Sequence, residues 1–288
     1  MSAGASRDAS PDFDRPVAED QRGTVLLFLH IPRTGGSTLL RLLDRQYGGE
    51  AVLQAYDAGS ADEVARLHAE RPARTRVIAG HFYYGVHRRL AASCHYLTFL
   101  RDPVERVVSH YYFVRSRPEH YLHAAAATMS LPEYVESCGA AEPNNDQTRL
   151  LAGEEMLPSD GTASDAMLPV AKQNLDSHAA VGLTDAFDAS IVMMQRVFGW
   201  GRPFYVPENR SDRERGDRLR SDVRDLIRIR NALDLELYEH ARELFRRRVA
   251  EQGSAFRRDV RVFSVLNTFH RRAVLAAASR ARFRQIRA

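Results

Sequence analysis

The segment TVLLFLHIPRTGGSTLLRLL, residues 24–43, limits the possible folds more than any other part of the sequence. Val25–Leu29 is an unbroken apolar run, which is typical of a strand buried on both faces of a parallel sheet. After a turn of sequence PRTGGST, the leucines at positions 39, 40, 42 and 43 have the spacing of one helix face. These residues therefore predict a strand–turn–helix unit.

Three further strands are expected, at Val77–Ala79, Tyr96–Leu100 and Ala180–Leu183. One helix should begin near Pro103, because proline suits the first turn of a helix, and Thr184 or Asp185 should cap another. Helical spacing recurs later in the chain, at Leu226, Ile229 and Leu233 and then at Leu237, Ala241, Leu244 and Phe245. Strands that alternate with helices predict an α/β fold with a mainly parallel sheet flanked by helices.

The ends of the chain differ from its middle. Residues 1–22 are polar and proline-rich, so they predict a disordered tail rather than a secretory signal. No apolar run reaches the roughly 18 residues that a membrane span needs. The two cysteines, Cys94 and Cys138, form no C-x-x-C pair, which favours a reducing, cytoplasmic location. We expect one α/β domain over residues 23–252 and a basic helical extension over residues 253–288.

The turn after the first strand has the composition of an anion site. Backbone N–H groups at the start of a helix lack partners, and glycines let an anion such as phosphate approach them closely. The pattern G-x-x-x-x-G-K-[ST] of ATP- and GTP-binding loops is not met, because no lysine follows Gly36. From these residues alone, an ordinary glycine-containing connection is the favoured explanation of the turn.

A second motif, YLTFLRDPVERVVSHYYFVR at residues 96–115, distinguishes between these two interpretations. It places Arg101 at the end of a strand and Ser109 about two turns into the next helix. Ligands of open α/β sheets bind beyond the carboxyl ends of the strands, so Arg33 and Arg101 should share one edge. Taken alone, Arg101 and Asp102 could equally form a structural ion pair.

Together the two motifs resemble those of the carbohydrate-type sulfotransferases, which include the heparan sulfate 2-O- and 6-O-sulfotransferases and many bacterial relatives. Three further segments agree: Gly80-His81, NNDQTRLLAG at residues 144–153, and the region of residues 171–200. The helix LDLELYEHARELF at residues 233–245 is also similar to the family's C-terminal element. The resemblance covers about residues 24–250 and implies a P-loop-like three-layer fold.

The resemblance implies a donor and the residues that bind it. The donor is 3′-phosphoadenosine 5′-phosphosulfate (PAPS), and no metal is required. The family's 5′-phosphosulfate loop matches Arg33, Thr34, Gly35, Gly36, Ser37 and Thr38. Arg101 and Ser109 match the pair that holds the 3′-phosphate. Arg33 stands where the family more commonly has lysine; we interpret the exchange as tolerated, because this chain has a single lysine, Lys172.

The resemblance also implies a general base at His81, which removes the proton from the acceptor hydroxyl. The acceptor would be a hydroxyl of a glycan or glycolipid. His30 and His87 are rival bases, a carboxylate such as Asp146 is the next candidate, and His110 is expected to pack.

Two other segments of the resemblance have no assigned role. Asn145, Gln147 and Arg149 could line the acceptor cleft or cap a helix, and the sequence favours neither role over the other. Asn209 and Arg210 could form a loop over the adenine, although a solvated loop is favoured.

The C-terminal extension carries nine arginines and one aspartate from Arg257 onward. Its apolar residues form one helical stripe, at Val262, Val265, Leu266, Phe269, Ala273 and Ala276. Such a helix could lie on an anionic membrane or dock on the core, and docking is slightly favoured because Phe263, Phe269 and Phe283 need apolar surroundings. Two other functions stay open: a nucleotide-dependent kinase or NTPase, and a nucleic-acid-binding module that uses the arginines. The oligomeric state is not predicted.

Overall fold

The computed structural model describes residues 24–137, 142–208 and 219–286, and side chains up to residue 279. The predicted tail at residues 1–22 lies outside this part. Within the described residues, five strands form one sheet: β1 Thr24–Leu29, β2 Val52–Gln54, β3 Val77–Gly80, β4 Ser93–Leu100 and β5 Ala180–Leu183. Their order is β2-β3-β1-β4-β5, and every pairing is parallel. The predicted α/β fold with a parallel sheet is confirmed.

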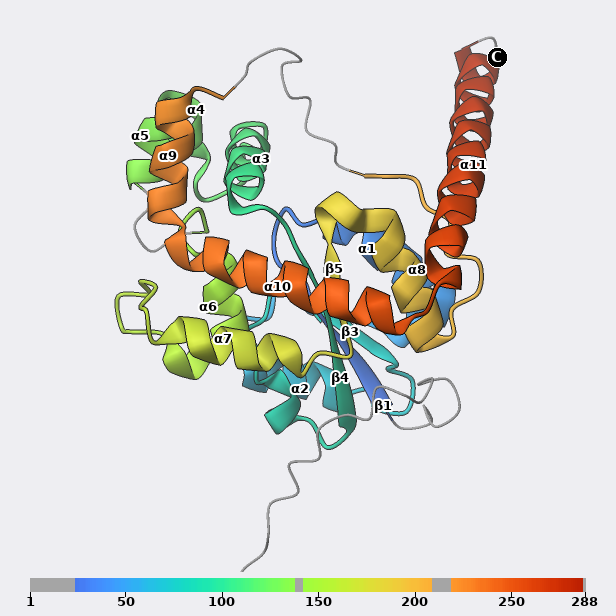
Figure 1. Cartoon of the computed structure of the whole chain (residues 1–288), viewed down its shortest axis with the longest axis horizontal. Coiled ribbons are helices and arrows are strands. Elements are labelled where there is room, and N and C mark those ends of the chain that lie inside the picture. Colours follow the sequence, from blue (N-terminus) through green and yellow to red (C-terminus); the bar gives the residue numbers. More distant parts are fainter. Residues whose placement is uncertain (1–23, 138–141, 209–218, 287–288) are drawn as a thin grey trace, which may run out of the picture.

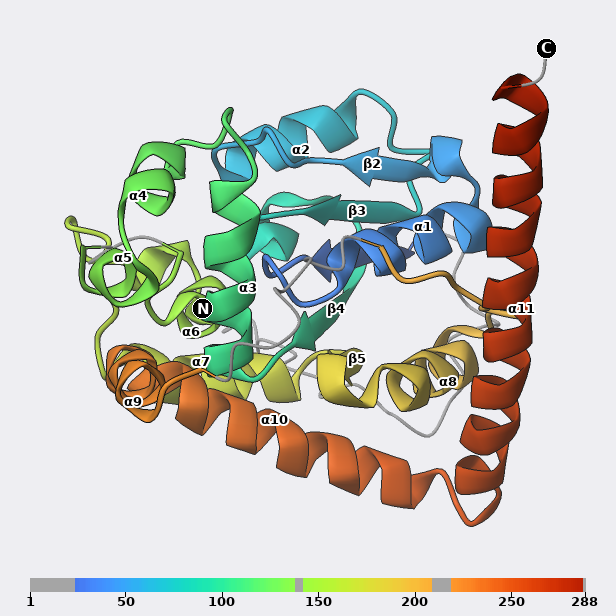
Figure 2. The same cartoon turned by 90° about the horizontal axis from the view of Figure 1, so that it is seen from above.

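Helices flank this sheet (Figures 1 and 2). In chain order they are α1 Gly36–Tyr47, α2 Ala61–Ala69, α3 Pro103–Arg115, α4 His123–Thr128, α5 Leu131–Ser137, α6 Asp146–Ala152, α7 Met167–Asp176, α8 Phe187–Phe198, α9 Ser221–Arg230, α10 Ala232–Glu251 and α11 Ala255–Ile286. The contacts of α1 with β3 and of α10 with β5 and α7 build the layers around the sheet. The core is continuous, since it includes β1, β4 and the inner faces of α1, α8 and α10.

Three details differ from the sequence prediction. The three-residue strand β2 was not expected, because Val52–Gln54 is too short to show a period. Thr184 does not cap α8 with its side chain; its hydroxyl donates instead to the carbonyl oxygens of Thr34 (2.8 Å) and Leu100 (3.1 Å). Ile229 is exposed rather than buried.

The parallel register gathers four strand ends at one edge of the sheet. Leu29, the last residue of β1, lies opposite Gly80 of β3 and Thr98 of β4, and Leu100 lies opposite Leu183 of β5. The residues that follow these strands therefore emerge together. They are His30, His81, Arg101 and Thr184.

A buried ionic network connects α3, α6 and α10. The guanidinium group of Arg106 is fully buried, 3.4 Å from the Asp146 carboxylate and 3.8 Å from that of Asp234. Asp234 also accepts hydrogen bonds from the backbone N–H and the hydroxyl of Thr148, each at 2.8 Å. Because the charges of Arg106, Asp146 and Asp234 are all removed from water, each of these residues requires its partners.

The C-terminal helix α11 docks on the core through its first half. Phe256 and Phe263 are buried, and the helix packs against α8 (Figure 2). The predicted apolar stripe lies on the opposite face: Val262, Val265, Leu266 and Phe269 are 48–62% exposed. Docking thus depends on residues outside the predicted stripe, and the side chain of Phe283 lies outside the described part. Contact of the exposed face with an anionic membrane stays a prediction.

Among the described residues, no helix is both long enough and apolar enough to cross a membrane.

We expect the substitution Asp234→Ala to lower the free energy of unfolding by about 3–5 kcal/mol, because it leaves Arg106 buried with fewer partners. Urea unfolding followed by circular dichroism measures this. Glu239→Ala is the matched control on α10, since Glu239 is exposed and pairs only with surface arginines, and its cost should stay within about 0.5 kcal/mol. Equal costs for the two variants would show that the network contributes little.

Candidate active site

A cavity of about 590 Å³ lies at the edge where the strand ends gather. It brings together most of the predicted site residues, namely Arg33, Gly35, Gly36, Ser37, Thr38, His81, Arg101 and Ser109. Its other lining residues are His30, Pro32, Phe113, Thr184, Phe187, Tyr205, Pro207, Glu208 and Arg271. Thr34 is absent from this lining, since its buried hydroxyl donates to the Ile31 carbonyl oxygen at 2.8 Å.

Close packing requires both glycines of the turn. Gly35 has a φ of +92°, and a Cβ atom there would lie 2.9 Å from the Phe187 ring. A Cβ atom on Gly36 would lie 1.8 Å from Nε2 of His30. With neither side chain present, the N-terminus of the twelve-residue helix α1 faces the cavity, and the first N–H groups of a helix have no partners within the helix itself.

Arg33 adopts a left-handed backbone conformation, with φ at 70°, which turns its side chain toward α3. Its Nε and Nη2 atoms both lie 3.2 Å from Oγ of Ser109, and its guanidinium group stacks 4.3 Å from the centre of the Phe113 ring. Burial and the charges of Arg101 and Arg117 lower the pKa of Arg33 to about 10. An anion bound here would relieve this repulsion.

Arg101 is held by both its backbone and its side chain. The amide of Gln147, which is fully buried, accepts from the Arg101 backbone N–H and donates to its carbonyl oxygen, both at 3.0 Å. The side chain donates to the Arg33 carbonyl oxygen at 3.2 Å and lies 3.5 Å from the Glu105 carboxylate. Asp102 caps α3 by accepting from the backbone N–H of Glu105 (3.0 Å). The charged partner of Arg101 is therefore Glu105.

The segment at residues 144–153 has a structural role in this arrangement. Asn145 accepts from the Asp234 backbone N–H at 3.1 Å, so it caps α10 rather than its own helix. Arg149 is buried and donates to Asp146 at 3.0 Å. Of the two roles left open by the sequence, helix capping fits Asn145, whereas Gln147 holds Arg101 in place. Asn209 and Arg210 lie outside the described residues.

Two histidines, His30 and His81, lie side by side at the cavity edge, with ring centres 4.6 Å apart. His81 is exposed, and its Nδ1 atom lies 2.7 Å from the His30 carbonyl oxygen. A carbonyl only accepts, so Nδ1 carries a proton, and in the neutral form of the ring Nε2 then has the free lone pair. His30 is buried, and its Nδ1 atom is hydrogen-bonded to the Tyr56 hydroxyl at 2.8 Å. Burial, followed by the charges of His81 and Arg33, lowers the pKa of His30 well below 6.5.

The other rival bases are engaged elsewhere. His87 lies outside the cavity lining, with Nδ1 3.0 Å from the Tyr96 hydroxyl. Asp146 is buried between Arg106 and Arg149, at 3.4 and 3.0 Å. Of the candidates that the sequence offered, His81 combines exposure with an available nitrogen at the cavity.

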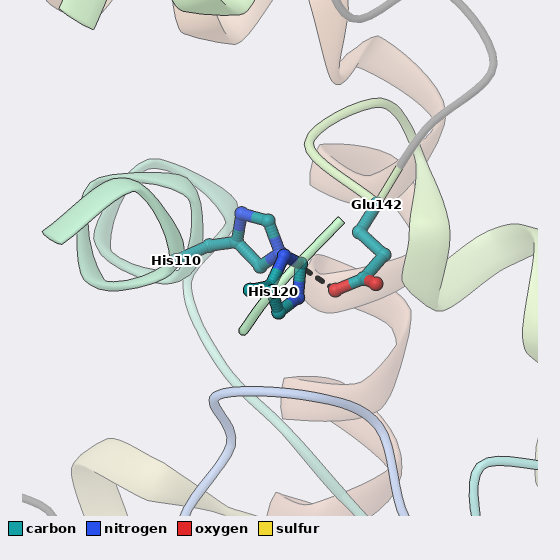
Figure 3. A group of neighbouring side chains, drawn as sticks. All are labelled: His110, His120 and Glu142. Atoms are coloured by element: carbon teal, nitrogen blue, oxygen red, sulfur yellow. Dashed lines mark hydrogen bonds and ion pairs between the residues drawn. The ribbon is translucent and has the colours of Figure 1, made fainter. Parts of the chain in front are cut away.

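His110, His120 and Glu142 form a cluster that sequence spacing did not indicate (Figure 3). One nitrogen or oxygen of each lies within 4.8 Å of the others, so a metal ion is sterically possible there. Existing hydrogen bonds already use these atoms: His110 Nε2 lies 2.6 Å from Glu142, and His120 Nδ1 accepts from the Leu122 N–H at 3.2 Å. Burial raises the pKa of Glu142, but the His110 hydrogen bond and charge lower it to about 2. The hydrogen bond between His110 and Glu142 thus explains the cluster, and the absence of a metal stays a prediction.

The cavity also contains residues that the sequence analysis did not select. Phe187, Tyr205 and Arg271 come from separate elements, and no local motif marks them as neighbours. Gln147 belonged to a noted motif, but its pairing with Arg101 depends on how α6 packs against the end of β4.

We expect the substitution His30→Asn to reduce the loss of stability between pH 7.5 and 5.5. The folded-state pKa of His30 lies below that of the unfolded chain, so the unfolded chain binds the proton more readily and stability falls as pH drops below about 6.5. One such group contributes roughly 1.4 kcal/mol over this interval. Urea unfolding at both pH values measures the difference. An unchanged pH dependence in the variant would mean that His30 is accessible to protons.

Comparisons with known proteins agree with this geometry. Residues 5–279 match the model of the galactose-3-O-sulfotransferase family. Human heparan-sulfate 6-O-sulfotransferase 1 is 25% identical, over 87% of this chain and 72% of its own length. Zebrafish (Danio rerio) heparan-sulfate 6-O-sulfotransferase 1-B is 26% identical, over 90% of this chain and 75% of its own. The chain therefore belongs to the galactose-3-O-sulfotransferase family of carbohydrate sulfotransferases and is an enzyme that transfers sulfate groups.

Proposed function

We propose that the enzyme transfers a sulfuryl group from PAPS to a hydroxyl group of a glycan or glycolipid, in the cavity at the strand ends. The observation that carries the proposal is the convergence of Arg33, Arg101 and the N-terminus of α1 opposite the exposed His81. The relatives that act on heparan sulfate support a glycan acceptor. The proposal includes a cytoplasmic location, which the cysteine content supports, and contact of the exposed face of α11 with an anionic membrane.

The donor fits the cavity by charge and by shape. PAPS carries phosphate groups at two positions of the ribose and a terminal sulfate, and all three are anionic. The N–H groups after Gly35 suit the 5′-phosphosulfate, while Arg101 and Ser109 suit the 3′-phosphate. Arg33 contacts Ser109, so in this proposal its guanidinium group spans the space between the two anionic ends of the donor.

The proposed reaction uses the neutral tautomer of His81 that carries its proton on Nδ1. Its Nε2 atom accepts the proton of the acceptor hydroxyl, whose oxygen forms the new bond to sulfur. The bond between sulfur and the bridging oxygen of the donor breaks, and 3′-phosphoadenosine 5′-phosphate (PAP) leaves with that electron pair. Arg33 and the α1 N-terminus stabilise the negative charge on the leaving oxygen. The hydrogen bond from His81 to the His30 carbonyl oxygen fixes the required tautomer.

We expect PAP to bind without added metal, and the substitution Arg101→Ala to weaken binding by about 1.5–3 kcal/mol, the value for a hydrogen bond to a charged group. Calorimetry in the presence and absence of EDTA measures both. Arg115→Ala, at the far end of the helix that follows Arg101, is the control, because Arg115 is exposed and bonds to Tyr111. Loss of binding in EDTA, or equal competition by ATP, would contradict the donor assignment.

Gln147→Met gives a second test of the same site. The substitution keeps the size of the side chain but removes both hydrogen bonds to the Arg101 backbone, so PAP affinity should fall although Gln147 lies outside the cavity lining. Combined with Arg101→Ala it should add little, because the two residues act through one contact. Fully additive losses would show that Gln147 acts independently of Arg101.

We expect the substitution His81→Ala to lower the rate of sulfate transfer by ~10²–10⁴, the effect of losing a general base, and to leave PAP affinity nearly unchanged. Transfer from labelled PAPS to heparan-type glycans and glycolipids measures the rate. His87→Ala is the control, since that histidine follows the same strand but lies outside the cavity lining. Similar rates for the two variants would show that His81 is not the base.

A further inference from the structure

The segment of residues 201–208, here called the strap, connects the cavity to the C-terminal helix. The Glu208 backbone N–H donates to the Thr38 hydroxyl at 3.0 Å, which ties the strap to α1. The Tyr205 backbone N–H donates to the buried Asn267 side chain of α11 at 2.8 Å, and the Tyr205 hydroxyl donates to Asp188 of α8 at 2.7 Å. The strap thus lies between the N-terminal turn of α1 and α11, and it contacts both.

Specific contacts also fix the register of α11. Ser264 donates to Asp188 at 2.6 Å, and Arg196 of α8 pairs with Asp259 at 2.5 Å. Phe204 of the strap stacks on Phe263, with ring centres 5.7 Å apart. Together with the buried Asn267, these contacts determine which face of α11 points to the cavity.

Arg271 follows Asn267 by four residues, so it lies on the same face of α11. Its half-buried side chain lines the cavity together with Tyr205 and Pro207. Among the described residues, no hydrogen bond or ion pair joins it to a carboxylate, and Glu208, the carboxylate of the cavity lining, pairs with Arg41. Arg271 is therefore a cation directed into a cavity that already holds Arg33 and Arg101.

Arg271 enters the cavity from α11, and so from a different side than Arg33 and Arg101, which follow β1 and β4. Figures 1 and 2 place α3, which carries Ser109, and α11 on opposite sides of α1. Next to Arg271 in the cavity, Phe187 and Tyr205 present aromatic rings with centres 4.9 Å apart. Aromatic rings and a guanidinium group suit a purine base, by stacking and by hydrogen bonding.

We propose that Arg271 binds the base and ribose end of the nucleotide donor, so that α11 is part of the donor site rather than an appended extension. The inference rests on the proposed function, which places PAPS in this cavity. It assigns the 3′-phosphate to Arg101 and Ser109, and the opposite side of the nucleotide to Arg271 and the strap. Donor binding and the docking of α11 then stabilise each other.

The test compares Arg271→Gln with Arg272→Gln, a neighbouring exposed arginine of the same helix, in the full-length protein. Calorimetry with PAP and with adenosine 5′-monophosphate measures affinity. Arg271→Gln should weaken both ligands about tenfold or more and by similar factors, whereas Arg101→Ala should weaken only PAP by that amount. Arg272→Gln should stay within about twofold of wild type.

Hydrogen exchange gives a readout that does not depend on affinity alone. Saturating PAP should slow amide exchange around Asn267 in wild type and in Arg272→Gln, and should slow it less in Arg271→Gln. Wild-type affinity of Arg271→Gln for both nucleotides would overturn this inference and leave the proposed function intact. A selective loss of PAP affinity would move Arg271 to the 3′-phosphate and overturn the assignment to the base. Absence of PAP binding by the wild type would overturn both proposals.

Discussion

The fully buried guanidinium group of Arg106 is the interaction on which the arrangement of the site depends. It lies on α3, the helix that also carries Ser109. Its partner Asp146 is the first residue of α6, and its partner Asp234 lies in the first turn of α10. A buried charge without partners is costly, so the three helices must pack in this one register. The positions of Ser109 and Gln147 follow from this packing. The network thus links core stability to the edge of the sheet where the cavity lies.

The histidine pair shows how two neighbouring strand ends produce side chains of different chemistry. His30 follows β1 at the centre of the sheet, where the Gly36 backbone covers it, and burial lowers its pKa. His81 follows β3, one strand nearer the edge, and stays exposed. His30 contributes its carbonyl oxygen to orient His81, while its own ring remains neutral and supports the turn. Sequence position favoured His81 over His30 as the base, and the difference in burial gives a physical reason for their separate environments.

The sequence predicted what depends on local patterns. Apolar runs located β1, β3, β4 and β5, and the motif around Arg33 and the motif around Arg101 indicated one shared edge, because parallel strand ends must meet there. What it could not predict depends on long-range packing. The bond of Thr184 to the Thr34 carbonyl oxygen and the pairing of Gln147 with Arg101 join segments far apart in the chain. The hydroxyl of Thr34 is a local exception, since it turns inward onto Ile31.

The C-terminal helix illustrates the limit of periodicity most clearly. Its regular stripe of apolar residues is exposed, whereas docking uses Phe256, Phe263 and the polar Asn267. A search for hydrophobic periodicity does not count a polar residue such as Asn267, so it does not identify the docked face. One helix therefore has two distinct faces: an inner face that completes the core and the cavity, and an exposed outer face of apolar residues among arginines. Deleting the helix would remove both faces, so the proposed membrane contact can be tested separately from the proposed donor binding only by substitutions confined to exposed positions such as Leu266 and Phe269.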